Sequence, residues 1–234
     1  MISEFSQALI SKKQAGFIPV IPDIKCNSPK EGDLLRGRDP LAMAKLLEEA
    51  GAPALSVVTE QKYFGGSIKL LEKIATVTTL PLLRKDFISN IDDLKITKDC
   101  GAAAILLICA KLPFAKLAKL YEQAIQIGLE PLVEVHSTEE LTFAANIGAT
   151  LIGINNRDIT NLEKDDGTVS VTKSLAINKP QNALLVSESA IQTPAEARAA
   201  IDAGADAVLI GTAIWQADDM HKCFLAFSKI GDII

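Results

Sequence analysis

The stretch GAAAILLICAKLPFAKLAKLYEQAIQIGLEPLVEV, residues 101–135, contains the repeating unit that decides the fold. It opens with an apolar run at 103–108 and closes with a second apolar run at 131–135. Between the two runs, apolar residues recur at helical spacing: Phe114, Leu117, Tyr121, Ala124 and Ile125. Gly128 is placed to end this helix. The apolar runs are continuous rather than alternating, which is typical of parallel strands covered on both faces. We therefore predict two parallel strands joined by a helix.

The same unit recurs along the chain. Similar apolar runs occupy residues 17–24, 54–58, 81–83, 151–154, 183–186 and 207–210. Helices are expected to begin near Asp39, Ser67, Asn90, Phe114, Ser137, Val169, Thr193 and Asp218. Ser137 and Glu140 have the spacing of a capping box, in which each side chain bonds to the other's backbone N–H. Eight strand-helix units predict an α/β fold that closes into a single (β/α)8 TIM barrel. A doubly wound open sheet is the alternative, but it usually has fewer strands, and no G-x-G-x-x-G motif follows the first run.

Length and composition restrict the protein's class. The 234 residues are 48% hydrophobic, enough for one large core, so we expect one domain over 1–234 with a helical extension at about 3–15. A long loop is expected at 163–168. The net charge of −5 and the lack of a basic tract argue against nucleic acid as a partner. No apolar run approaches the ~20 residues of a membrane span, and the N-terminus lacks a signal peptide's apolar region. Four scattered cysteines and two distant histidines form no metal or haem pattern, which favours reduced thiols in the cytoplasm.

Polar residues follow six of the predicted strands. Barrels of this type place their active sites at the C-terminal ends of the strands. The residues at those ends are Asp23, Lys25, Arg84, Lys85, Asp86, Glu134, Asn155, Asn156, Arg157, Asp158, Ser187, Glu188, Ser189, Gly211 and Thr212. Asp23 and Lys25 are two positions apart and share a face, and Glu134 between two valines is expected to point inward. Buried charges must be neutralised by one another or by a ligand. A ring of ion pairs is the structural alternative, but charges that converge from six strands favour a site.

The residue types at these ends indicate acid–base chemistry on an anionic ligand. A lysine in a cationic pocket has a lowered pKa and serves as a general acid, so Lys25 and Lys85 are candidates. Glu134 and Glu188 are candidate bases or cation stabilisers. The hydroxyl of Ser189 and the backbone N–H groups near 190 and 211–212 follow the last two strands, where this fold usually binds phosphate. The sequence therefore predicts a phosphorylated small molecule as the ligand.

Seven segments together resemble the indole-3-glycerol phosphate synthase family. The family's first strand resembles E-x-K-x-x-S-P-S, and its sixth resembles G-I-N-N-R-(D/N)-L. The matching segments here are 23–30 (DIKCNSPK), 59–67 (TEQKYFGGS), 83–87 (LRKDF), 132–136 (LVEVH), 153–159 (GINNRDI), 187–191 (SESAI) and 209–212 (LIGT). They occur in order on the predicted strand ends and cover the chain from about Ile18 onward. Each motif alone is weak, but the combination is highly specific.

This resemblance implies a carbon–carbon lyase of tryptophan biosynthesis that needs no cofactor. The family closes the indole ring of 1-(2-carboxyphenylamino)-1-deoxyribulose 5-phosphate, with loss of CO2 and water. Lys85 would then be the general acid, Glu134 would transfer protons, and Lys25 would hold the carboxylate or act as a second acid. Asp23, Glu188 and Asn155 complete the implied catalytic set. The implied substrate-binding residues are Ser28, Arg157, Ser189, Ala190, Leu209, Gly211 and Thr212. Other enzymes of the tryptophan pathway are candidate partners.

Two substitutions and a short N-terminal segment depart from the family pattern. Asp23 stands where the family has glutamate, which retracts the carboxylate by roughly 1 Å, and a misplacement of about 1 Å can cost on the order of 100-fold in rate. Ala190 stands where the family has glycine, which allows positive φ.

These departures motivate a second hypothesis, a paralogous phosphate-binding barrel with another sugar-phosphate substrate. A non-catalytic partner barrel is a third, but retention of Lys85 and Glu134 speaks against it. A phosphoribosylanthranilate isomerase fits poorly, because Asn155 rather than an acid ends the sixth strand.

Overall fold

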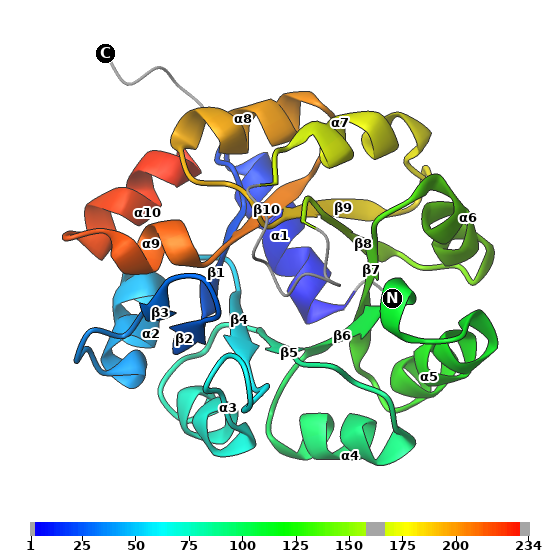
Figure 1. The fold of residues 1–234 in the computed structure, drawn as a ribbon, viewed down its shortest axis with the longest axis horizontal. Helices are drawn as coiled ribbons and strands as arrows, with labels where there is room; N and C mark the ends of the chain where they lie inside the picture. Colours follow the sequence, from blue (N-terminus) through cyan, green and yellow to red (C-terminus); the bar gives the residue numbers. More distant parts are fainter. Residues whose placement is uncertain (1–2, 158–166, 230–234) are drawn as a thin grey trace.

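The computed structural model describes residues 3–157 and 167–229. In this part of the chain, eight parallel strands close into a barrel in the order β1-β10-β9-β8-β7-β6-β5-β4, as Figure 1 shows. The strands are β1 (Val20–Ile24), β4 (Leu55–Val58), β5 (Leu82–Lys85), β6 (Ala104–Ile108), β7 (Glu130–Val135), β8 (Leu151–Asn155), β9 (Leu184–Glu188) and β10 (Ala207–Ile210). The short strands β2 (Asn27–Ser28) and β3 (Gly32–Asp33) form an antiparallel hairpin after β1. The predicted (β/α)8 barrel is confirmed, and the open-sheet alternative is wrong because β1 pairs with both β4 and β10.

Helices surround the barrel (Figure 1). They are α2 (Pro40–Glu49), α3 (Ile68–Ala75), α4 (Ile91–Asp99), α5 (Phe114–Gln126), α6 (Thr138–Asn146), α7 (Ser170–Leu175), α8 (Pro194–Asp202), α9 (Thr212–Gln216) and α10 (Met220–Ser228), with 3-10 turns η1 (Cys109–Lys111) and η3 (Ala176–Asn178). The expected capping box of α6 forms only in part. Ser137 Oγ accepts from Glu140 N, but the Glu140 carboxylate accepts from the N–H of His136 instead of that of Ser137. Of the loop expected at 163–168, residues 163–166 lie outside the described residues. Within the described residues, no helix is long and apolar enough to cross a membrane.

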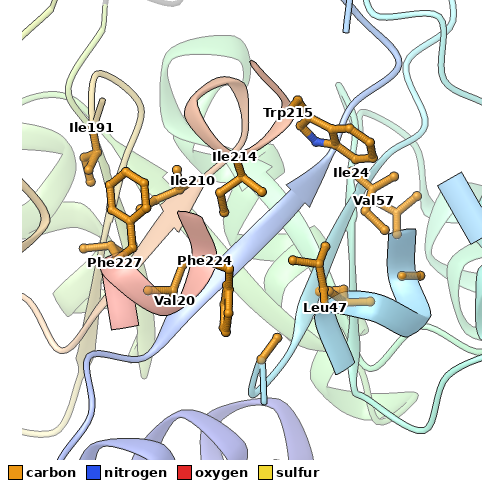
Figure 2. Packing of buried hydrophobic residues seen from close by; sticks show 14 of the residues in the cluster. Val20, Ile24, Leu47, Val57, Ile191, Ile210, Ile214, Trp215, Phe224 and Phe227 are labelled. Carbon is orange, nitrogen blue, oxygen red and sulfur yellow. The ribbon is translucent and has the colours of Figure 1, made fainter. Parts of the chain in front are cut away.

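The core has two layers because strand side chains alternate between the barrel interior and the helices. One set faces the helices, and Figure 2 shows part of it, with Phe224 and Phe227 of α10 packed beside Val20 of β1. The other set fills the barrel interior and includes Ile21, Leu83, Leu106, Leu132, Val186 and Leu209. Interior packing of this kind makes the barrel a solid core rather than a pore.

The N-terminal helix α1 (Glu4–Gln14) closes one end of the barrel. Its Phe5 and Leu9 are buried among the interior residues, and Figure 1 shows α1 crossing the middle of the strand ring. Ser6 Oγ donates a 2.6 Å hydrogen bond to Glu130 Oε1. The Lys13 ammonium lies 2.7 Å from Asp206 Oδ1. Because Glu130 begins β7 and Asp206 precedes β10, α1 covers the N-terminal ends of the strands. The end with the candidate site residues lies opposite.

Candidate active site

Two adjoining pockets lie at the C-terminal ends of the strands. The first has an open volume of about 490 Å³, solvent at its mouth included, and the second about 380 Å³. Both volumes are in the range of small-molecule sites. Asp23, Lys25 and Lys85 line both pockets. The arrangement suits an elongated ligand whose middle passes over these three titratable groups.

The two pockets differ in chemistry. Besides the shared residues, the first is lined by Val58, Glu60, Phe64, Asp86, Phe87, Leu106, Ile108 and Asn155. The second is lined by Arg157, Ser189, Ala190, Ile191, Gln192, Leu209, Ile210, Gly211 and Thr212. The first is therefore mostly apolar and holds two aromatic rings, while the second offers a guanidinium group, hydroxyls and backbone N–H groups. An aromatic ring suits the first pocket, and an anion suits the second.

Asp23, which lines both pockets, is held in place by hydrogen bonds. Ser56 Oγ on β4 donates a 2.6 Å hydrogen bond to Asp23 Oδ1, and Trp215 Nε1 donates to the Asp23 carbonyl at 2.7 Å. The end of β10 approaches closely, since a Cβ at Gly211 would lie 3.3 Å from Asp23 Cβ. Lys25 is buried, and its ammonium lies 5.6 Å from the centre of the Phe64 ring, within cation–π range. The aspartate is thus held in one position by β4, by α9 and by the end of β10.

Lys85 lies between two buried glutamates. Its Nζ is 4.0 Å from Glu134 Oε2 and 3.9 Å from Glu188 Oε2, so β5, β7 and β9 each contribute one member. Both glutamate side chains are fully buried. Val133 and Val135 pack toward the helices, so Glu134 points into the barrel interior, the direction expected from alternation. Within the described residues, neither oxygen of Glu134 accepts a hydrogen bond. A lysine this close to buried carboxylates is the kind of group that exchanges protons with a ligand.

Gly153 on β8 provides the space for the Glu188 carboxylate. A Cβ at this position would lie 1.9 Å from Glu188 Oε1. Gly153 is also the register partner of Glu134 on β7. No other residue type leaves this volume open, so the glycine of the 153–159 segment is required by the buried acid beside it.

The turn after β9 has unusual backbone geometry at the anionic end of the site. Ser189 has φ +65° and Ala190 has φ +55°, in the left-handed region that favours glycine. Alanine therefore keeps the backbone conformation of a glycine at this position, at a cost in strain.

Asn156, which the sequence placed only among the polar strand-end residues, braces this turn. Its Nδ2 lies 3.0 Å from Ser187 Oγ, 2.9 Å from the Glu188 carbonyl and 3.2 Å from the Ser189 carbonyl. Its Oδ1 accepts from Thr172 N at 3.1 Å and from Thr172 Oγ1 at 2.9 Å. The amide is buried, so these bonds are shielded from competing water. Their effect is to hold the strained turn against α7.

The structure brings most of the predicted site residues together. Asn155 lines the apolar pocket, and its Oδ1 accepts from Arg157 N at 3.0 Å. Glu134 and Glu188 lie beneath the pockets and contact them through Lys85. Among the described residues, Ser28 lines neither pocket. Its hydroxyl accepts from the N–H groups of Lys30 and Glu31, both at 3.3 Å, within the β2-β3 hairpin. Asp158 lies outside the described residues.

Comparison with known proteins gives one consistent result. A sequence profile described as indole-3-glycerol phosphate synthase matches residues 2–226. A protein of that name from Pyrococcus furiosus is 49% identical over 209 residues, which cover 89% of this chain and 91% of the relative. The Pyrococcus abyssi protein is 45% identical over 209 residues, covering 89% and 90%. The Oceanobacillus iheyensis protein is 39% identical over 214 residues, covering 90% and 80%. Because the match spans nearly the whole chain, and the strand-end motifs meet around one pair of pockets, the chain belongs to the indole-3-glycerol phosphate synthase family.

Proposed function

We propose that this protein converts 1-(2-carboxyphenylamino)-1-deoxyribulose 5-phosphate, an anilino ketose phosphate, to indole-3-glycerol phosphate, with release of CO2 and water. The observation that carries the proposal is the pair of pockets joined at Lys85, one apolar and one suited to an anion. The substrate has the same layout, with an aromatic ring at one end, a phosphate at the other and the reacting carbons between them.

The apolar pocket suits the carboxyphenyl ring. Phe64 and Phe87 line it with ring centres 6.5 Å apart and tilted at 55°, so they offer apolar and edge contacts to a third ring. Lys25 at this end is placed to pair with the ring carboxylate. The phosphate would then lie in the second pocket, against Arg157, Ser189 and the backbone of Ala190, Gly211 and Thr212.

In this pose the chemistry uses acids and bases of the chain. Lys85 donates a proton to the ketose oxygen while the ring carbon that carries the carboxylate attacks the ketose carbon and forms the new carbon–carbon bond. Breakage of the bond to the carboxylate releases CO2 and restores the aromatic ring. The resulting hydroxyl takes a second proton, from Lys25 as the second acid, and leaves as water with help from the electron pair of the anilino nitrogen. Glu188 stabilises the cationic intermediate. Glu134 handles the proton transfer next to the anilino nitrogen, where it accepts the proton lost from the neighbouring carbon, and this completes the double bond of the five-membered ring. Each buried acid–base group of this kind contributes roughly 100- to 10,000-fold in rate.

Asp23 favours a second candidate, a barrel of the same family with another phosphorylated sugar as substrate. Its carboxylate is held against Ser56, so the shorter side chain does not extend toward the ligand as a glutamate would. Extra room beside Lys25 would then accept a different group. Ala190 argues less strongly for this candidate, because its φ of +55° keeps the glycine-like turn.

The test is turnover by the purified protein, followed by indole fluorescence after addition of the anilino ketose phosphate. We expect turnover by the wild type and a loss of at least about 100-fold in Lys85→Ala with circular dichroism unchanged. Lys119→Ala, which removes an exposed lysine, is the matched control and should keep full activity. Binding of the compound without turnover would favour the second candidate, and absence of both would contradict the proposal.

We propose the cytoplasm as the place of action, since all four cysteines are unpaired thiols, as a reducing compartment requires. Other enzymes of the tryptophan pathway are candidate partners, because they would supply the substrate or consume the product.

A further inference from the structure

A row of three titratable side chains leads away from the buried end of the site. His136 Nε2 lies 3.5 Å from Glu134 Oε1, and His136 Nδ1 lies 3.3 Å from Glu140 Oε2. Lys85 approaches the other oxygen of Glu134, Oε2, so the histidine and the lysine contact different atoms of one carboxylate. In the part of the chain that the structure describes, neither His136 nor Glu140 lines the two pockets. The row therefore connects the reaction site to a region that the ligand does not occupy.

The two outer members of this row are partly exposed, whereas Glu134 is not. The side chain of Glu134 is 0% exposed, whereas those of His136 and Glu140 are 18% and 15% exposed. A proton on Glu134 has no direct contact with solvent, and neither has a proton on His136 Nε2, because that nitrogen is also buried. The way out to water therefore leads through Nδ1 to Glu140. The imidazole thus links the buried Glu134 to the partly exposed Glu140.

The local backbone fixes Glu140 beside the imidazole. Glu140 Oε2 accepts a 2.6 Å hydrogen bond from the His136 backbone N–H, and Ser137 Oγ accepts from Glu140 N at 3.2 Å at the start of α6. This is the bond that replaces half of the expected capping box. A carboxylate at Nδ1 favours a proton on that nitrogen, which leaves Nε2 as an acceptor facing Glu134. The arrangement resembles the way a carboxylate orients a catalytic histidine.

The neighbouring titratable groups are suited to this role. The groups that face the imidazole or its partners are Glu134 on β7, Glu140 on α6, Cys109 on η1 and Lys85 on β5. Burial raises the pKa of the Cys109 thiol to about 12, and the charges of Glu140 and Glu134 add to the rise. The thiol therefore stays neutral, and a positive imidazolium would be balanced by the two carboxylates that flank it.

We propose that His136 is a positioning residue that resets the protonation state of Glu134 in each turnover. The inference rests on the proposed function, in which Glu134 takes up a proton. Glu134 gives that proton to His136 Nε2, and the resulting imidazolium passes its Nδ1 proton to the Glu140 carboxylate. The partly exposed side chain of Glu140 then releases the proton to water. The 3.5 Å separation shortens to a hydrogen bond when Glu134 is protonated, since catalytic hydrogen bonds in ligand-free enzymes are often long.

The test compares His136→Ala and Glu140→Gln with Glu139→Gln, a matched control that removes an exposed charge from the same helix turn. We expect kcat to fall about 100-fold in His136→Ala with KM for the anilino ketose phosphate unchanged. Added imidazole should restore kcat in this variant but not in Lys85→Ala. Glu140→Gln should lower kcat by a smaller factor, and Glu139→Gln should keep it.

A purely structural role would produce a loss of kcat that imidazole does not restore, and that result would overturn the inference. Full activity in His136→Ala would overturn it as well. If His136→Ala does not fold, kcat is measured against pH in His136→Gln and in the wild type. An inflection between about pH 5 and 8 that the wild type shows and the variant lacks supports the relay, and identical profiles overturn it. Failure of the wild type to turn over the substrate would instead contradict the proposed function, so the two failures are distinguishable.

Discussion

Gly153→Ala should lower kcat strongly while it lowers the stability of this protein only slightly. The added Cβ would lie 1.9 Å from Glu188 Oε1, and real Cβ contacts essentially never fall below 3.0 Å, so the carboxylate must retreat by about 1.1 Å. The nearest atom is the far end of a flexible side chain, so the backbone need not move. The free energy of unfolding should therefore fall by only about 1–2 kcal/mol. A misplacement of about 1 Å in an active site can cost on the order of 100-fold in rate. We therefore expect a large loss of kcat with a small loss of stability.

The assay is kcat from indole fluorescence, paired with urea unfolding of the same protein preparation. Ile154→Val is the matched control, because this neighbour on β8 packs toward the helices. Removing its methyl group should cost about 0.5–1.5 kcal/mol of stability and leave kcat unchanged. The double variant Gly153→Ala/Glu188→Asp should recover part of the lost stability, since the shorter acid leaves room for the methyl group, but it should not recover kcat, because the carboxylate stays displaced. Wild-type kcat in Gly153→Ala would refute the reasoning, because it would mean that the position of Glu188 does not limit the reaction.

Three further predictions concern the turn after β9 and the closed end of the barrel. Ala190→Gly should remove the strain of φ +55° and raise stability by up to about 1 kcal/mol, seen as a Tm increase of roughly 2–4 °C; an unchanged Tm would contradict the strain. Asn156→Asp places a carboxylate against three oxygen atoms, so inorganic phosphate should bind about tenfold more weakly in calorimetry, while unaltered binding would show that the turn needs no brace. Burial favours a raised pKa for Asp206, but hydrogen bonds from Lys13 and Lys179 outweigh it, so the pKa of Asp206 is lowered. Its stabilisation is therefore present above the ordinary aspartate pKa of about 3.9 and is lost as the pH falls through the lowered value, so the stability difference between wild type and Asp206→Asn should shrink in acid urea titrations.

The sequence was sufficient for the barrel because the signals that specify it are local. Continuous apolar runs, helix caps such as Asp39 and Thr193, and terminal glycines all act within one strand-helix unit. The elements that the hydrophobic pattern did not predict are short and have no clear periodicity. Helix α9 has 5 residues and strands β2 and β3 have 2 each, which is too few for a recognisable hydrophobic period.

The titratable members of the site were predictable because they stand at strand ends, where the fold alone brings them together. The apolar wall formed by Val58, Phe64, Phe87, Leu106 and Ile108 was not, since those residues read equally well as core. The bracing role of Asn156 was also hidden. Its partners lie 16 and 31 to 33 positions away along the chain, and a single sequence carries no signal for such contacts. Which of the strand-end residues act on a substrate stays a prediction.

The helix across the lower end of the barrel has a consequence for protein engineering. Phe5 and Leu9 seal the interior from below, and the polar anchors of α1 hold the beginnings of strands rather than their ends. The residues that secure the scaffold and those that would contact a substrate are thus separated by the full depth of the barrel. A library of variants confined to the apolar wall of the mouth could explore new ring systems while the seal at the other end keeps the scaffold folded.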